Sequence, residues 1–479
     1  MNRKKYETII NKIKSDNIDV SCRYINSITG QVAIVFIKQI TDRALLSQQI
    51  IKPLVREEKK YNLNAKYVMD NVIFSGECEL ENDFEKVEAY LLEGMTILLF
   101  SNDSRYIVAN LKKVEQRSVT EPDITYSYRG PKDCFNENLD TNISLIRYRL
   151  KNKNFRIDYQ EVGERTKTRV AVVYFEDIAN NEAVKEVKKR IDSIKIDGII
   201  ESGELQAFLL NKKYNIFPQM GIVERSDMAC GALLEGKVIV IVEGSGYALV
   251  APKVLSEFLW SCDDKYANKF IGYFARFLRV TALMLSYAIP SMYIAIVSFH
   301  NDILPSDYII AIAQARSKVP FNALIEVLII EIFISLLIEG LIRVPSKIGT
   351  AIAIVGAIII GEAAIAAGIF SPLLLIVVSI SLISTFVPSD ITSVRPFRFL
   401  RFGLIILTGI FGLYGFVLGL VLLLSQLVST NSFGVAYMTP FAPFITKDAV
   451  KSLFYNVTTA PRRPYFLKTK DKYRGKANK

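Results

Sequence analysis

The sequence predicts a chain of two unlike parts: a tandem pair of related α/β subdomains, followed by a polytopic helical transmembrane domain. Two observations predict this fold class. Long apolar runs with few charges gather after residue 277, and a β-β-α pattern occurs twice before it. We therefore expect a soluble front half joined to a membrane-embedded back half.

The front half contains the same order of strands and helices twice. Each copy has two alternating, β-branched stretches, which are typical of paired strands. They are Ile18–Tyr24 with Gln31–Ile37, and Phe155–Val162 with Arg169–Phe175. A helix start is predicted after each pair, at Asp42 in the first copy and at Asp177 or Asn180 in the second.

Shorter matches extend the repeat. The matching pairs are Ser75–Glu77 with Ser202–Glu204, and Glu93–Gly94 with Glu235–Gly236. Each Glu-Gly pair precedes two apolar stretches joined by a turn, near Asn102–Asp103 and at Gly244–Gly246. These patterns predict two subdomains of related topology, over residues 1–118 and 119–265.

The back half, residues 266–446, is predicted to contain about four to six membrane segments, because a helix needs about 20 residues to cross a hydrocarbon core. Four apolar runs are long enough, or nearly so: Phe277–Ser298, Ile348–Ala367, Phe370–Pro388 and Phe402–Val428. A fifth run, Phe321–Ile342, carries Glu326, Glu331 and Glu339. It fits either a packed span or a helix lying in the membrane plane.

Basic clusters indicate which ends of these segments face the cytoplasm. They are Arg276/Arg279, Arg343/Lys347, Arg395/Arg398/Arg401 and the basic tail, residues 447–479. Five spans satisfy the first three clusters but place the tail outside. The tail lies inside only if Phe402–Val428 or Ser432–Thr446 folds back. Met1–Ser15 is Lys-rich without an apolar core, so we expect no signal peptide and a cytoplasmic front half.

Composition argues against several classes of function. The chain has one histidine, His300, and five scattered cysteines without a CxxC pair, so we expect no metal site. No catalytic residue set or nucleotide-binding loop is evident, and we predict neither an enzyme nor a cofactor. The net charge of +11 is concentrated in the tail. We therefore expect the tail to bind membrane lipids with anionic headgroups and not nucleic acid.

One predicted membrane helix has a face of small residues, which let helices approach closely or line a narrow pore. Together with Ile360 and Glu362 of the same run, these small residues form the set that we expect to line a pore or to contact another helix. The set is Gly349, Ala353, Gly356, Ile360, Glu362, Ala363 and Ala367. A charge such as Glu362 at membrane depth costs at least about 3 kcal/mol unless it faces protein or water. Glu362 is also close enough to Gly368 to reach the membrane interface.

The segment Arg129–Arg149 resembles the signature of the A subunits of GerA-type nutrient germinant receptors of bacterial endospores. Its matching residues, with two prolines from similar stretches further on, are Arg129, Gly130, Pro131, Asn142, Arg147, Arg149, Pro345 and Pro372. Other similar stretches are Phe299–Pro305, Arg316–Phe321 and Ser432–Tyr437. From its own pattern, the signature is a turn and an amphipathic helix that either packs within the fold or contacts another subunit.

The resemblance implies a multi-pass protein of the spore inner membrane with a cytoplasmic N-terminal domain. Such A subunits act with a transporter-like B subunit and a lipoprotein C subunit, and form a homo-oligomeric ring around an ion-conducting pore gated by small nutrients. The SpoVAF-type branch shares the architecture but is linked to ion release without a nutrient site. The remaining alternative is a membrane transporter or sensor subunit without its own pore.

Overall fold

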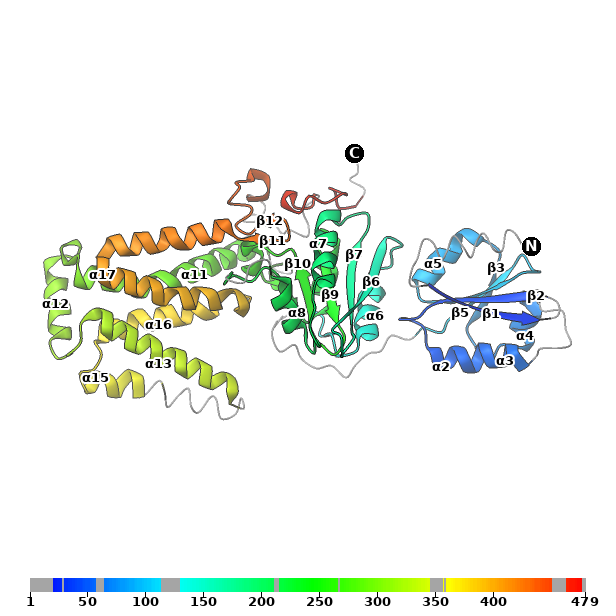
Figure 1. The fold of residues 1–479 in the computed structure, drawn as a ribbon, viewed down its shortest axis with the longest axis horizontal. Coiled ribbons are helices and arrows are strands. Elements are labelled where there is room, and N and C mark those ends of the chain that lie inside the picture. Colours follow the sequence, from blue (N-terminus) through cyan, green and yellow to red (C-terminus); the bar gives the residue numbers. More distant parts are fainter. Residues whose placement is uncertain are drawn as a thin grey trace. The chain divides into compact units, whose positions relative to one another are not determined.

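The computed structural model describes residues 20–27, 30–56, 64–112, 130–210, 215–265, 268–344, 356, 359–449 and 462–475 (Figure 1). The chain forms two compact units. The α/β unit comprises Met1–Leu210, Met220–Pro252 and Thr458–Lys479, and the helical unit comprises Asn211–Gln219 and Lys253–Val457. Each unit therefore contains a segment that is distant in sequence from the rest of it.

The first sheet of the α/β unit has five antiparallel strands in the order β1-β2-β4-β5-β3. The strands are β1 (Val20–Ser27), β2 (Gly30–Ile37), β3 (Cys78–Glu81), β4 (Thr96–Phe100) and β5 (Tyr106–Ala109). The helices are α2 (Arg43–Leu45), η1 (Leu46–Ile51), α3 (Lys52–Arg56), α4 (Ala65–Asn71), η2 (Phe84–Lys86) and α5 (Val87–Leu92). Alternate residues of β2 and β4 enter two separate apolar clusters, so both faces of the sheet are covered.

The second sheet has the order β6-β7-β9-β10-β8, which is the order of the first sheet strand for strand. Its strands are β6 (Phe155–Val162), β7 (Thr168–Phe175), β8 (Gly221–Val223), β9 (Val238–Val242) and β10 (Ala248–Ala251). Its helices are α6 (Leu139–Arg149), α7 (Asn181–Asp192), α8 (Ser202–Leu209) and α9 (Ser226–Glu235). The predicted repeat of two related α/β folds is therefore confirmed.

Most of the short sequence matches that indicated the repeat correspond to equivalent positions in the two folds, and one does not. Asp42 caps α2, and Asn180, not Asp177, caps α7. Gly94 and Gly236 end equivalent helices with φ of +92° and +94°, a conformation that favours glycine. The match between Ser75–Glu77 and Ser202–Glu204 is wrong: the first stretch leads into β3, whereas the second begins α8.

The helical unit is built from long apolar helices around α11. Its helices are α10 (Leu255–Phe258), η3 (Cys262–Lys265), α11 (Lys269–Ser298), η4 (Asn301–Ile303), α12 (Ser306–Arg316), α13 (Ala323–Arg343), η5 (Ile359–Ala363), α15 (Ala364–Ala366), α16 (Pro372–Phe386) and α17 (Ile391–Ser429). Two short strands follow, β11 (Asn431–Ser432) and β12 (Val435–Ala436). The helix α11 packs against α13, α16 and α17.

The helix α17 is a hairpin and not one continuous rod (Figure 1). Gly412 has a non-helical φ of +62° and ψ of −140°. A methyl group at Gly419 would lie 2.3 Å from Leu404 Cδ1, whereas a straight helix would separate these positions by about 22 Å. The run Phe402–Val428 therefore folds back, which is one of the two alternatives that place the tail inside.

By length and composition, two of the described helices are long and apolar enough to cross a membrane. They are Phe270–Ser298 in α11 and Thr392–Ser429 in α17, and Pro372–Phe386 is a shorter apolar helix. Because α17 bends at Gly412, its apolar length is shared between two arms, residues 391–411 and 413–429.

The described end of the basic tail packs within the α/β unit. Phe466 and Leu467 of η6 (Tyr465–Leu467) are buried, and the Lys470 amide donates to Ile178 O at 3.0 Å. Arg463 donates through Nε to Leu234 O at 2.8 Å and pairs with Asp471 at 2.8 Å. These side chains attach this part of the tail to the domain, and binding of the tail to anionic lipids stays a prediction.

Candidate functional site: buried ion pairs of the helical unit

Two carboxylates of α13 lie in the interior of the helical unit. Glu326 and Glu331 are both 0% exposed, although the helix that carries them is largely apolar. Glu339, the third acid of this run, is exposed and pairs with Arg343 at 2.7 Å. A charge in such an interior costs several kcal/mol unless a counter-ion and hydrogen bonds compensate it. The partners of Glu326 and Glu331 therefore define the candidate site.

Arg401 of α17 is the partner of Glu331. Its Nη2 lies 2.6 Å from Glu331 Oε2, and both side chains are almost completely buried. Its Nη1 donates to Ser286 O of α11 at 3.0 Å and to Ser381 Oγ of α16 at 2.6 Å. One planar guanidinium thus connects four helices, a geometry that the fixed fork of arginine donors permits and a lysine ammonium does not.

Proline explains why Ser286 O is free to accept these bonds. In an α-helix this carbonyl would accept from the backbone nitrogen four residues later. That residue is Pro290, which lies inside α11 and has no N–H. Ser381 Oγ also donates to Ser286 O, at 3.0 Å. The carbonyl that Pro290 exposes is therefore satisfied by two side chains from other helices.

A second cluster surrounds Glu326. Arg316 Nη2 of α12 lies 3.3 Å from Glu326 Oε2, and the Ser371 amide donates to Glu326 Oε1 at 2.5 Å. Tyr293 OH lies 3.1 Å from Ser371 Oγ and accepts from Arg316 Nη1 at 3.5 Å. The two acids of α13 are thus each held by an arginine from a different element.

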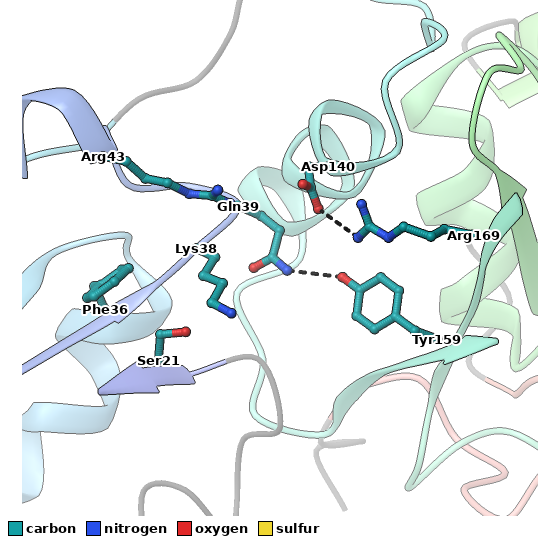
Figure 2. A pocket seen from close by; sticks show the side chains of 8 residues that line it. All are labelled: Ser21, Phe36, Lys38, Gln39, Arg43, Asp140, Tyr159 and Arg169. Carbon is teal, nitrogen blue, oxygen red and sulfur yellow. Dashed lines mark hydrogen bonds and ion pairs between the residues drawn. The ribbon is translucent and has the colours of Figure 1, made fainter. Parts of the chain in front are cut away.

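A cavity in the α/β unit is the other candidate, with a volume of about 550 Å³. Figure 2 shows the side chains that line it, with Gln39 Nε2 donating to Tyr159 OH at 3.0 Å and Arg169 facing Asp140 at 3.6 Å. Arg169 and Asp140 are 41% and 38% exposed, so water already solvates them. The buried pairs of the helical unit are the stronger candidate because their charges require a specific environment.

Residues 7–465 match the family described as Bacillus/Clostridium GerA spore germination protein. The chain belongs to this family. Two relatives from Bacillus subtilis (strain 168) are spore germination protein KA, 34% identical over 92% of this chain and 82% of the relative, and spore germination protein B1, 33% identical over 86% and 85%.

One further relative and one solved structure are also similar to this chain. Spore germination protein GerLA of Bacillus cereus is 34% identical over 92% of this chain and 90% of its own length. The N-terminal domain of the A subunit of the Bacillus megaterium spore germinant receptor GerK3 matches 52% of this chain and 94% of that domain, at 24% identity and a TM-score of 0.36.

The signature residues that suggested the GerA family have structural roles in the second α/β fold. Asn142 accepts from the Asn136 amide at 2.7 Å, and Arg147 is buried with its guanidinium 4.9 Å from the Phe155 ring centre. Arg149 pairs with Asp133 at 2.7 Å. Gly130 and Pro131 are half-buried in the turn before α6, and Arg129 lies outside the described residues. The signature helix therefore packs within the fold, as one of the two alternatives stated.

The structure separates the predicted pore or helix-contact residues. Gly356 faces Leu337 of α13, since an added methyl group would lie 2.5 Å from Leu337 Cδ1. Glu362, Ala363 and Ala367 are exposed. Ile360 lies in the π-helical turn η5, while Gly349, Ala353 and Pro345 lie outside the described residues. Pro372 is the first residue of α16, whose N-cap is Ser371.

The small-residue face is interrupted for a clear reason. The small residues share one face only if the helix is a continuous α-helix with 3.6 residues per turn. Residues Ile359–Ala363 instead form a π-helical turn, which shifts the register of everything after it. Gly356 therefore points towards α13, while Ala363 and Ala367 point elsewhere.

Sequence reasoning missed Arg401 as a site residue. Its proximity to Arg395 and Arg398 made it look like part of a cytoplasmic cluster, whereas it is buried against Glu331. Pro290 within an apolar run was the available signal, because a proline there frees a carbonyl that needs a donor. Among the described residues, no three His, Cys, Asp or Glu side chains gather as a metal site.

Proposed function

We propose that this chain is the A subunit of a spore germinant receptor that oligomerises in the membrane and forms or gates an ion-conducting pore opened by small nutrients. The observation that carries the proposal is the burial of Glu326 and Glu331 with their arginines inside an apolar helical bundle. Ionisable groups in such bundles commonly mark ion pathways or the elements that control them. Membership of the GerA family supplies the germination context.

The proposed topology has six crossings with both ends of the helical unit on the cytoplasmic side. The crossings are α11, α13, the apolar run Ile348–Ala367 predicted from the sequence, α16 and the two arms of α17. This arrangement supports the proposal because it places Arg276, Arg343, Arg395 and the tail at one side, as the positive-inside rule requires. The sheets then lie in the cytoplasm, and the membrane is the inner membrane of the spore.

Exposed charges support assembly into a ring. Glu362 is exposed although the segment around it is apolar, and lipid contact at membrane depth is costly for a carboxylate. A neighbouring copy or a water-filled pore would cover it. By extension from the family, the B subunit and the lipoprotein C subunit complete the receptor.

Ion flux in liposomes tests the proposal, measured both for the purified full-length chain and for the complete receptor. We expect a nutrient-dependent flux in the complete receptor, and Glu362→Gln should change flux or native mass while membrane insertion stays close to wild type. Unchanged flux and mass in Glu362→Gln would remove Glu362 from the pore. Flux that never responds to nutrients would favour the SpoVAF-type alternative, and absence of flux would favour a sensor subunit without its own pore.

A further inference from the structure

We infer that Arg401 is a positioning residue that fixes α13 against the rest of the helical unit and thereby holds the pore closed. The inference rests on the proposed function. In this view, separation of Arg401 from Glu331 accompanies opening, because it releases α13 and the segment packed on it.

A single side chain, that of Arg401, connects α13 to the neighbouring helices. Arg401 reaches α11 through Ser286 O, α16 through Ser381 Oγ and α13 through Glu331. Apart from the Glu326 cluster, α13 packs in this region through apolar residues such as Val327 and Ile330. Apolar side chains in lipid provide little preference for one register over another, whereas a buried ion pair has a single geometry.

The ion pair between Arg401 and Glu331 holds α13 in place, but it lacks some hydrogen bonds and can therefore separate. Among the described residues, three atoms of the pair have no hydrogen-bond partner of good geometry: both carboxylate oxygens of Glu331 and Nε of Arg401. Water would supply these missing bonds if it entered the bundle. The ion pair therefore stays formed while water is excluded from the helical bundle. When water enters, its hydrogen bonds to the two side chains compensate for breaking the ion pair.

Transmission runs along α13. Leu337 lies six residues beyond Glu331, about 9 Å along the helix. Its Cδ1 occupies the space where a side chain at Gly356 would begin, at 2.5 Å. A shift of α13 therefore acts directly on the segment that carries Gly356 and, six residues further, the exposed Glu362.

The test combines a neutral pair with a matched control. In Glu331→Gln/Arg401→Met both charges are removed together, so no lone buried charge remains. In Arg401→Lys the charge stays, but a single ammonium nitrogen lacks the planar fork with which two guanidinium nitrogens reach acceptors on three helices. Glu339→Gln removes a carboxylate from the exposed pair on the same helix. Each full-length variant is reconstituted in lipid and measured for hydrogen exchange of α13 and for nutrient-independent ion flux.

We expect exchange of α13 and basal flux to rise about tenfold in the neutral pair, a smaller rise in Arg401→Lys, and wild-type values in Glu339→Gln. Wild-type exchange and flux in the neutral pair would overturn the inference. If the neutral pair does not accumulate, wild-type exchange and flux in Arg401→Lys would overturn it instead. Absence of flux from every protein, including wild type, would reject the proposed pore, while exchange of α13 would still decide the positioning role of Arg401.

Discussion

At the scale of single residues, Arg149 shows how a family signature can have a structural cause. Its guanidinium donates to both oxygens of Asp133 at 2.7 and 2.8 Å and to Ser226 Oγ at 2.9 Å. These contacts join the turn before α6 to the first residue of α9. Burial acts to raise the pKa of Asp133, but the hydrogen bonds from Arg149 and Ser226 and the Arg149 charge outweigh it, so the pKa is lowered.

Arg149→Gln should destabilise the α/β unit by about 1–3 kcal/mol, because Asp133 loses two charge-assisted hydrogen bonds. The lowered pKa makes this contribution fully present above the ordinary aspartate value of about 3.9, and it is lost as the pH falls through the folded-state pKa. Thermal unfolding of the full chain between acidic and neutral pH measures both effects.

The matched control is Arg165→Gln. Arg165 and Asp197 are 83% and 81% exposed and lie 3.7 Å apart, so their pair contributes little to stability. Equal melting temperatures for the two variants would contradict the role assigned to Arg149.

The partners of buried charges were harder to predict than the charges themselves. Glu326 and Glu331 stand out in an apolar run, so a need for partners is visible in the sequence. The identity of the partners is not, because Arg316 and Arg401 come from different elements and their pairing depends on how the helices pack. A periodic pattern contains information about one helix face, not about which other helix will cover it.

At the scale of elements, alternation predicted four strands of each sheet but not the fifth. The edge strands β3 and β8 are short, and β3 contains two glutamates in four residues. Such strands are defined by pairing with β5 and β10 and not by their own composition. The hairpin in α17 was foreseen only as an alternative, because a glycine within an apolar run does not by itself reveal a positive φ.

The contact of Gly356 with α13 gives a prediction for this element. Gly356→Leu should disturb packing, because its Cβ alone would lie 2.5 Å from Leu337 Cδ1 and the rest of the side chain needs more room than a rotation of Leu337 frees, whereas nothing lies within 4 Å of a Cβ at Gly361. We expect Gly356→Leu to change ion flux or native mass of the oligomer and Gly361→Leu to change neither. If both variants behave alike, this helix does not depend on close approach to α13, and the pore-lining segment should be sought elsewhere.

At the scale of the whole molecule, the exchange of segments links the two units through several chain connections. Phe217, between α8 and β8, is buried in the helical unit against Phe397 and Tyr437, at ring distances of 5.5 and 6.0 Å. Conversely, the end of the chain is buried in the α/β unit through Phe466 and Leu467. Sequence composition assigned these segments to a subdomain and to a tail, because composition records charge and apolarity but not which core a segment joins.

This exchange constrains the number of membrane crossings in the proposed topology. The tail packs within the same unit as the two sheets, so in an embedded chain both would lie on one side of the membrane and the number of crossings would be even. Five spans are excluded by this argument if the chain is embedded as proposed. In the proposed topology, the bend at Gly412 provides the additional crossing, because it turns one long apolar run into two arms.

Epitope tags at both ends and in the connection between α11 and α12 therefore provide the last prediction. In sealed inside-out vesicles from cells that express the full chain, protease should remove both terminal tags, since both lie on the cytoplasmic side. It should leave the tag inserted after Asp302, because this connection lies at the other end of α11. Detergent should expose all three tags, which controls for tag cleavage. If the C-terminal tag is protected while the N-terminal tag is cleaved, the crossing number is odd. The tail would then be unable to pack beside α9 and Ile178 in the membrane-embedded protein, and the arms of α17 would not both span.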